Sequence, residues 1–254
     1  MQTQIFTAHK RHLGLRAPTV LAVGFALTIL VGALVLMLPV SAADGQITPF
    51  LDALFTAASA SCVTGLVTVS TAVHWSVFGK CVILLLIQIG GMGVITVAAS
   101  FAMISGRKIS LMQRSTMQEA ISAPKVGGIV RLTGFIVRGT LVMELLCAAV
   151  MAPVFCRDFG KKGLWMALFH SVSAFCNAGF DLLGVRTPFS SLTSYAANPV
   201  INFTIMFLIV VGGIGFLTWD DIRANRLHLR KYRMQSKVIL CTTAVLLIVP
   251  AMYF

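Results

Sequence analysis

Two short segments of the chain, 114 positions apart, have residue types and spacing suited to holding a dehydrated cation. They are Cys62-Val63-Thr64-Gly65-Leu66 and Cys176-Asn177-Ala178-Gly179-Phe180, and each follows an apolar stretch of similar pattern. Extended backbone can offer carbonyl oxygens in place of the water around an ion. Glycine at Gly65 and Gly179 permits backbone angles that turn carbonyls toward one axis. We therefore predict an ion-binding filter of Val63, Thr64, Gly65, Asn177, Ala178 and Gly179, with ligands from the backbone of Cys62, Val63, Thr64, Cys176, Asn177 and Ala178.

The stretches before these segments, roughly 48–61 and 163–175, are too short to cross a bilayer. They fit half-helices that enter the membrane and end near its middle. Their C-terminal carbonyls and negative dipole ends would then favour a cation. The alternative is that each glycine only caps a buried helix. Because the arrangement occurs twice at matched positions, we favour the filter.

A second pair of repeats follows the first, namely Gly90-Gly91-Met92-Gly93 and Gly212-Gly213-Ile214-Gly215. Small residues let helices pack closely in lipid, and glycine can also kink a helix where a pore opens. We predict that most of these glycines serve packing. The second block is not a dinucleotide-binding motif, because it lies within an apolar span and not between a strand and a helix.

The composition predicts an integral membrane protein. Apolar residues make up 57% of the chain and charged residues 11%, against about 25% charged in typical globular domains. Stretches long enough to span a bilayer lie at 17–40, 80–104, 132–156, 199–219 and 238–254. The predicted fold is all-α, built from repeated units of span, re-entrant pore loop and span. Two units are complete and a third has begun.

The basic residues indicate how these units are oriented. The predicted order is a cytoplasmic N-terminus (1–16), a first unit (17–105), a cytoplasmic loop (106–131), a second unit (132–222), a cytoplasmic loop (223–237) and the start of a third unit (238–254). Lysine and arginine concentrate in the N-terminus and the two loops, which the positive-inside rule places in the cytoplasm. The net charge of +12 reflects this bias and favours contact with membrane lipids over nucleic acid.

Other reactive side chains do not combine into a catalytic or metal site. The six cysteines are predicted to be small apolar packers, and the histidines lack metal-ligand spacing. Cys62, Cys176, His170 and Glu119 form no nucleophile–base set, so we do not expect an enzyme.

Three charged residues in or near the membrane carry separate expectations. Glu144 and Arg138 lie within the span 132–156, where an ionisable residue is a functional candidate. We favour a structural role for both, through pairing with a neighbouring unit. Asp181 directly follows the second filter segment and is predicted to raise the cation concentration at the pore mouth.

The chain resembles a known family in its two pore loops and in one of its cytoplasmic loops. The run from Ser173 to Phe180, the segment Gly106-Arg107-Lys108-Ile109-Ser110-Leu111 and the triplet Gln118-Glu119-Ala120 are similar to the Trk/Ktr/HKT superfamily of potassium transporters, most closely to the membrane subunit of bacterial Ktr systems. The resemblance covers essentially the whole chain. It implies a potassium-channel-like pore surrounded by four units, with potassium as the ion held in the filter.

The same resemblance implies function and partners. Members take up potassium across the bacterial plasma membrane, often by symport with sodium or stimulated by it, and no tightly bound cofactor is expected. The implied assembly is a homodimer on a cytoplasmic ring of nucleotide-binding regulatory subunits. Serine at the filter position is associated with sodium passage in this superfamily, so Gly65 and Gly179 predict selectivity for potassium.

The chain departs from the family in the number of its units. It carries two complete units where the family has four, so we expect a fragment, a truncated product or a half-transporter that pairs with another chain; its end within a span favours truncation. The alternative function is a two-pore-loop potassium channel subunit that closes its pore by dimerisation. Such a channel is expected to carry filters like Thr-Val-Gly-Tyr-Gly, which neither loop here does.

Overall fold

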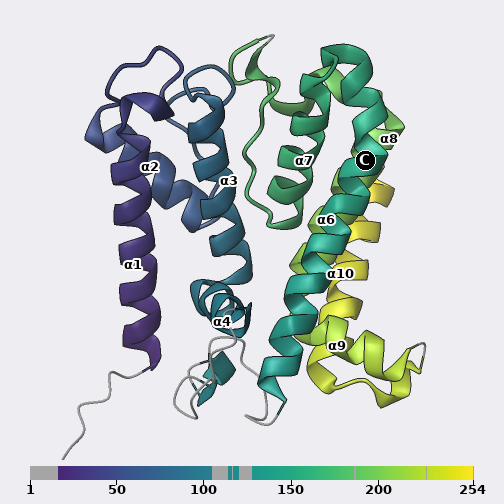
Figure 1. Ribbon diagram of the computed structural model, residues 1–254. Coiled ribbons are helices and arrows are strands. Elements are labelled where there is room, and N and C mark those ends of the chain that lie inside the picture. The colour runs from purple at the N-terminus through teal and green to yellow at the C-terminus, as the bar shows by residue number, and fades with distance from the viewer. Residues whose placement is uncertain are drawn as a thin grey trace, which may run out of the picture.

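The computed structural model describes residues 17–104, 114–115, 117–119, 128–185, 187–226 and 228–253. These residues form helices joined by turns (Figure 1), with one isolated antiparallel bridge between Ala42 and Trp75. The principal helices are α1 (Ala17–Leu36), α2 (Phe50–Ser61), α3 (Val77–Met92), α4 (Val94–Ile104), α6 (Ile129–Phe159), α7 (Lys162–Phe175), α8 (Pro199–Gly213), α9 (Phe216–Asn225) and α10 (Met234–Tyr253). The expected all-helical membrane fold is confirmed. The predicted N-terminus 1–16 and most of the loop 106–131 lie outside the described residues.

Long apolar helices make this a multi-pass membrane protein. Among the described residues, α1, α6 and α10 are long and apolar enough to cross a bilayer, and the bent pair α8 and α9 would make a fourth span. Leu34 on α1 and Leu246 on α10 are 60% and 66% exposed. Burial of such side chains is strongly favourable, so these helices are suited to contact with lipid.

The repeated sequence folds into repeated structure. In the first half α2 packs against α1 and α3, and in the second half α7 packs against α6 and α8. Both short helices lie in the upper half of the bundle in Figure 1, while α4 and α9 lie at its lower end. With 12 and 14 residues, α2 and α7 are half-helices, because a transmembrane helix needs about 20 residues.

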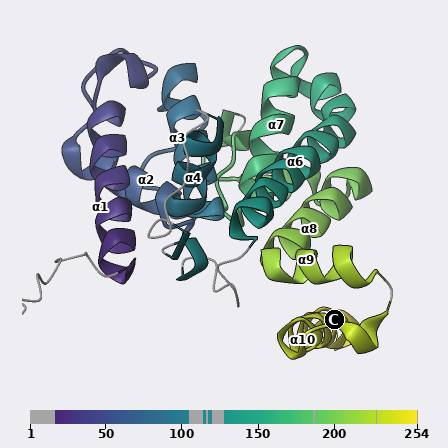
Figure 2. The ribbon, with the colours of Figure 1, turned by 60° about the horizontal axis from the view of Figure 1, so that its bottom comes forward.

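Two spans that were expected to be continuous, 80–104 and 199–219, are each broken into two helices. These are α3 and α4 in the first unit and α8 and α9 in the second, and we call each pair an inner helix. Each break falls at the third glycine of its block, where Gly93 and Gly215 have φ values of +84° and +81°. Such angles are rare for residues with a Cβ atom. The axes of α8 and α9 differ by 92°, and Figure 2 shows α9 turned away from α8. Gly93 and Gly215 therefore bend helices, and the packing predicted for these blocks falls to their other glycines.

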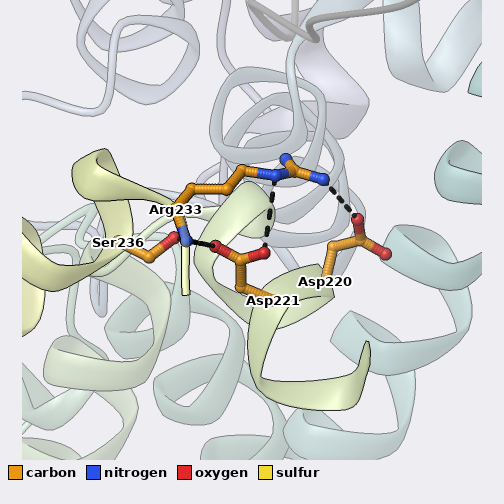
Figure 3. Close-up of polar contacts among 4 residues, drawn as sticks. All are labelled: Asp220, Asp221, Arg233 and Ser236. Carbon is orange, nitrogen blue, oxygen red and sulfur yellow. Dashed lines mark hydrogen bonds and ion pairs between the residues drawn. The ribbon is translucent and has the colours of Figure 1, made fainter. Parts of the chain in front are cut away.

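A compact polar cluster fixes the corner between α9 and α10 (Figure 3). Arg233 Nη2 lies 3.3 Å from Asp220 Oδ2, and Arg233 Nε lies 3.4 Å from Asp221 Oδ1. The nearly buried Asp221 carboxylate also accepts hydrogen bonds from the Arg233 backbone N–H and from Ser236 Oγ. One of these contacts satisfies a backbone donor at the start of α10, and together they tie the start of α10 to α9.

Candidate functional site

The two segments predicted as a filter share one backbone conformation. Val63 and Asn177 have φ values of 59° and 58°, and Gly65 and Gly179 have φ values of 74° and 73°. The residue between the two in each loop, Thr64 or Ala178, does not have a positive φ. Alternation of this kind allows successive carbonyl groups to point to one side of the chain, as a backbone ion site requires.

The end of each half-helix holds the loop that follows it through matched hydrogen bonds. In the first copy the Thr64 N–H donates to the Ser59 carbonyl at 2.9 Å, and Ser59 Oγ donates to the Leu66 carbonyl at 2.7 Å. In the second copy the Ala178 N–H donates to the Ser173 carbonyl at 2.7 Å. Ser173 Oγ then donates to the Phe180 carbonyl at 2.6 Å. One buried serine in each last helical turn therefore fixes both ends of its loop.

The two loops meet at their glycines. A Cβ atom added to Gly65 would lie 2.7 Å from the Ala178 carbonyl oxygen and 3.1 Å from Gly179 Cα. A Cβ atom added to Gly179 would lie 3.3 Å from Gly65 Cα. Because Gly65 and Gly179 have no side chain, the backbones of the two repeats can approach each other here. The half-helices α2 and α7 end four residues before these glycines, at Ser61 and Phe175, so the negative end of a helix dipole precedes each loop.

The first glycine of each Gly-Gly-x-Gly block, Gly90 or Gly212, lets the helix that carries it contact the end of a half-helix. A Cβ atom at Gly90 would overlap the Ser61 carbonyl, and one at Gly212 would overlap the Phe175 carbonyl. Ser61 and Phe175 are the last residues of α2 and α7. Gly91 fits against Cys176 of the other repeat in the same way. These contacts agree with the predicted packing role, and they hold the C-terminal ends of the half-helices against the helices that carry the glycine blocks.

The second loop has an additional support that the first loop lacks. His170 Nδ1 lies 2.7 Å from the Met166 carbonyl, so this nitrogen carries the proton. His170 Nε2 therefore accepts, and the Leu182 N–H donates to it at 3.2 Å. The imidazole is buried and stacks on Phe155 at 5.2 Å between ring centroids. The matching position in the first repeat is Thr56, which is buried and has no hydrogen-bond partner for Oγ1 among the described residues.

Asp181 lines a small cavity beside the second loop. The cavity measures about 200 Å³ and is lined by Asn177, Gly179 and Asp181 together with residues of α7 and α8. Asp181 is partly exposed, and its Oδ1 accepts the Leu183 N–H at 2.9 Å. This hydrogen bond holds the carboxylate near the loop. The first repeat has Val67 at the matching position, so only the second loop carries an acid there.

Glu144 lies in a polar network with residues of α3 and α7 next to the second loop. Its carboxylate is buried, and Gln88 Nε2 of α3 donates to it at 3.2 Å. Cys176 Sγ lies 4.0 Å from Gln88 Oε1, and Ser171 Oγ donates to the Glu144 backbone carbonyl at 2.7 Å. Glu144 thus joins the half-helix α7 to the inner helix of the other repeat. Its partner is Gln88, whereas Arg138 faces a separate groove.

A larger cavity lies between the two glycine blocks, on the side of α4 and α9. It measures about 450 Å³ and is lined by both glycine blocks. Thr96 and Thr218, at matching positions after the two blocks, also line it, as do residues of α1 and α10. The two repeats therefore line one shared cavity.

Of the predicted filter residues, the structure brings Gly65 of the first loop against Ala178 and Gly179 of the second. Several supporting residues were not identified from the sequence, namely Ser59, Ser173, His170 and Gln88. The serines could have been found, because they occur at the same position of both repeats. His170 and Gln88 have no counterpart of the same type, so the sequence carries no comparable signal for them.

Comparison with known proteins gives consistent matches. The family described as TrkH, cation transport protein, matches residues 4–248. The chain is 41% identical over 229 residues to the potassium/sodium uptake protein NtpJ of Enterococcus hirae, covering 90% of this chain and 49% of that protein. It is 42% identical over 230 residues to the Ktr system potassium uptake protein B of Bacillus subtilis, covering 90% and 50%.

A further relative is the Ktr system potassium uptake protein B of Vibrio alginolyticus. It is 34% identical over 239 residues, which cover 93% of this chain and 51% of that protein. The chain therefore spans about half the length of the curated relatives it matches.

Proposed function

Because the chain belongs to the TrkH family of cation transport proteins, we propose that it supplies two of the pore loops of a potassium uptake pathway. The observation that carries this proposal is the shared backbone conformation of residues 62–66 and 176–180, which meet at Gly65 and Gly179. In a complete pore, further loops of the same kind would close the ring around the ion.

The mechanism follows from the geometry of the loops. A potassium ion entering the filter exchanges water for backbone carbonyls of Cys62, Val63 and Thr64 in one loop and of Cys176, Asn177 and Ala178 in the other. The ends of α2 and α7 add negative dipole potential at the same place. Asp181 adds charge at the mouth of the second loop, and the cavity under the glycine blocks receives the ion after the filter.

Selectivity for potassium over sodium is part of the proposal. Carbonyl oxygens held at a fixed separation can replace the hydration water of potassium, the larger ion, better than that of sodium. The hydrogen bonds from Ser59 and Ser173 tie each loop to its own half-helix, which supports a fixed separation. One relative is named a potassium/sodium uptake protein, and sodium-dependent symport is therefore included in the proposal.

The assembly is proposed from the names of the relatives and from the charge distribution. Relatives named as parts of a Ktr system support a membrane subunit that works with a regulatory subunit. We propose that the regulatory subunits form a cytoplasmic, nucleotide-binding ring and that the transporter is a homodimer on that ring. The N-terminus and the side of α4 and α9 would face the cytoplasm of a bacterial cell, in accordance with the basic loops.

The test uses a completed protein, in which the chain is joined to the half of the Bacillus subtilis relative that it does not match. A bacterium that lacks its own potassium uptake systems should grow at low potassium when it produces the completed protein. Membrane levels of the protein are measured by immunoblot. Growth at high sodium without rescue at low potassium, at normal protein levels, would contradict the proposal.

A further inference from the structure

A groove at the lower end of the bundle in Figure 1 lies between α4, α6 and α9. It measures about 600 Å³ and is bounded by apolar side chains, among them Phe135 and Val142. Helices α6 and α9 approach closely beside it, because a Cβ atom at Gly139 would lie only 3.1 Å from the Trp219 ring. At Gly134, by contrast, no atom lies within 4 Å of an added Cβ, so this side of α6 is open.

Three arginines line this apolar groove. Arg131 and Arg138 are seven positions apart on α6 and so share one face of the helix. Arg223 comes from α9, and its guanidinium lies 4.7 Å from the centre of the Phe135 ring. All three are exposed. The groove therefore combines concentrated positive charge with an apolar wall.

The acidic residues of the chain do not neutralise these arginines. Among the described residues, the ion pairs join Arg233 to Asp220 and Asp221 (Figure 3), and these two aspartates are the only acids of α9. Glu144 is buried against Gln88 on another side of α6. The remaining acids are Glu119, in a short helical segment after α4, and Asp44, Asp52, Asp158 and Asp181 near the opposite end of the bundle. Among the described residues, no acidic side chain forms an ion pair with the three arginines of the groove.

The depth of the groove in the membrane follows from the length of α6. This helix has 31 residues, more than the roughly 20 that cross the hydrocarbon core. Arg157 and Asp158 mark the water boundary at one end. Counting about 20 residues back along the helix reaches the turn that contains Phe135 and Arg138. The groove therefore lies where hydrocarbon meets lipid head groups, on the side of α4 and α9.

We propose that this groove binds an anionic phospholipid of the cytoplasmic leaflet. The phosphate lies among Arg131, Arg138 and Arg223, because guanidinium groups form paired hydrogen bonds with phosphate oxygens. An acyl chain lies along the open strip of α6 beside Gly134, against Phe135 and Val142. Basic pockets between membrane helices are suited to such head groups. The choice of leaflet rests on the proposed orientation, whereas the site itself does not depend on the transported ion.

The experiment uses the purified 254-residue chain in detergent, titrated with phosphatidylglycerol or phosphatidylcholine and followed by native mass spectrometry. The first variant is the triple substitution Arg131→Gln, Arg138→Gln and Arg223→Gln. The matched control is the triple substitution Arg226→Gln, Arg230→Gln and Lys231→Gln, which removes equal charge from exposed positions outside the groove. A second variant, Gly134→Leu, keeps all three arginines and fills the groove. Size-exclusion chromatography checks the folding of every protein.

Selective binding of phosphatidylglycerol is expected for the chain and for the control variant. The groove triple variant should bind it about a hundredfold more weakly, since each basic residue contributes about fivefold near the surface and the three factors multiply. Gly134→Leu should also lose binding although no charge changes. Equal losses in the two triple variants would overturn the site in favour of diffuse attraction. Displacement of the lipid by soluble glycerol phosphate, or by an acidic peptide, at comparable concentration would overturn a lipid as the occupant.

Discussion

At the scale of single residues, Gly65 is the position where one added side chain would most directly disturb the proposed filter. Its φ is +74°, and a Cβ would lie 2.7 Å from the Ala178 carbonyl oxygen, a proposed potassium ligand. We expect Gly65→Ser to reduce the preference for potassium over sodium about tenfold, which corresponds to about 1.4 kcal/mol. The measurement is the ratio of rubidium to sodium uptake by the completed protein in vesicles.

Gly45→Ser is the control for this substitution. Gly45 has a φ of +70°, similar to that of Gly65, but no atom lies within 4 Å of its added Cβ. The control therefore introduces the same backbone strain far from the loops and should leave the uptake ratio unchanged. If both variants changed the ratio equally, the effect of Gly65→Ser would have to come from folding and not from the filter.

Glu144 allows a second test at this scale. Glu144→Ala removes the acceptor for Gln88 Nε2 from a buried site, and loss of such a partner costs about 1–3 kcal/mol. We expect a lower melting temperature in detergent for this variant. Glu144→Gln keeps the shape and an acceptor oxygen, so its melting temperature should remain near that of the unchanged chain. Equal destabilisation by both variants would instead indicate that the negative charge itself is required.

The sequence predicted some of these residues better than others. Left-handed backbone at Gly65 and Gly179 was foreseeable, because glycine adopts it without steric cost, and Asn177 is of a type that tolerates it. Val63 was not foreseeable, since a β-branched residue with positive φ is an outlier. In the structure, the hydrogen bond from the Thr64 N–H to the Ser59 carbonyl closes a tight turn around Val63, and this contact cannot be deduced from the type of residue 63.

At the scale of helices, the first glycines of the two blocks should control how the inner helices pack. A Cβ atom at Gly212 would overlap the Phe175 carbonyl at the end of α7. Backbone on both sides has little room to move, and overpacking of this kind costs about 1–3 kcal/mol. We therefore expect Gly212→Ala to lower the thermal stability of the chain in detergent.

Gly134→Ala provides the comparison on another helix. Gly134 also lies within a helix, but nothing lies within 4 Å of its added Cβ. Replacing a helical glycine with alanine in open space stabilises a helix by about 0.5–1 kcal/mol. Gly134→Ala should thus be neutral or stabilising. A loss of stability in Gly134→Ala equal to that in Gly212→Ala would remove the proposed packing role of Gly212.

The positions of helices followed from the sequence, while their breaks did not. Bilayer thickness limits the length of spans and half-helices, so apolar stretches predicted α1, α2, α7 and α10 well. The sequence gives no rule for which glycine of a Gly-Gly-x-Gly block packs and which bends. That distinction depends on contact with a half-helix: Gly90 and Gly212 face its last carbonyl, and Gly93 and Gly215 lie just beyond it.

At the scale of the whole molecule, two loops supply only part of a coordination shell. The chain covers about half the length of its relatives, and an ion in a filter needs carbonyls on all sides to replace its water. We expect the 254-residue chain alone, reconstituted in liposomes, to give no selective rubidium flux above empty vesicles. Robust selective flux would instead support the alternative in which two copies close a pore of four loops.

The proposal that residues 62–66 and 176–180 form a potassium filter is tested most directly by competitive uptake. Vesicles that contain the completed protein are given radioactive rubidium, and unlabelled potassium or sodium is added in increasing amounts. We predict that potassium suppresses rubidium uptake at concentrations at which sodium does not. We also predict that this difference is lost when Gly65 and Gly179 are both replaced by serine. Equal suppression by the two ions in the unchanged protein, or retention of the difference in the double variant, would contradict a filter at these glycines.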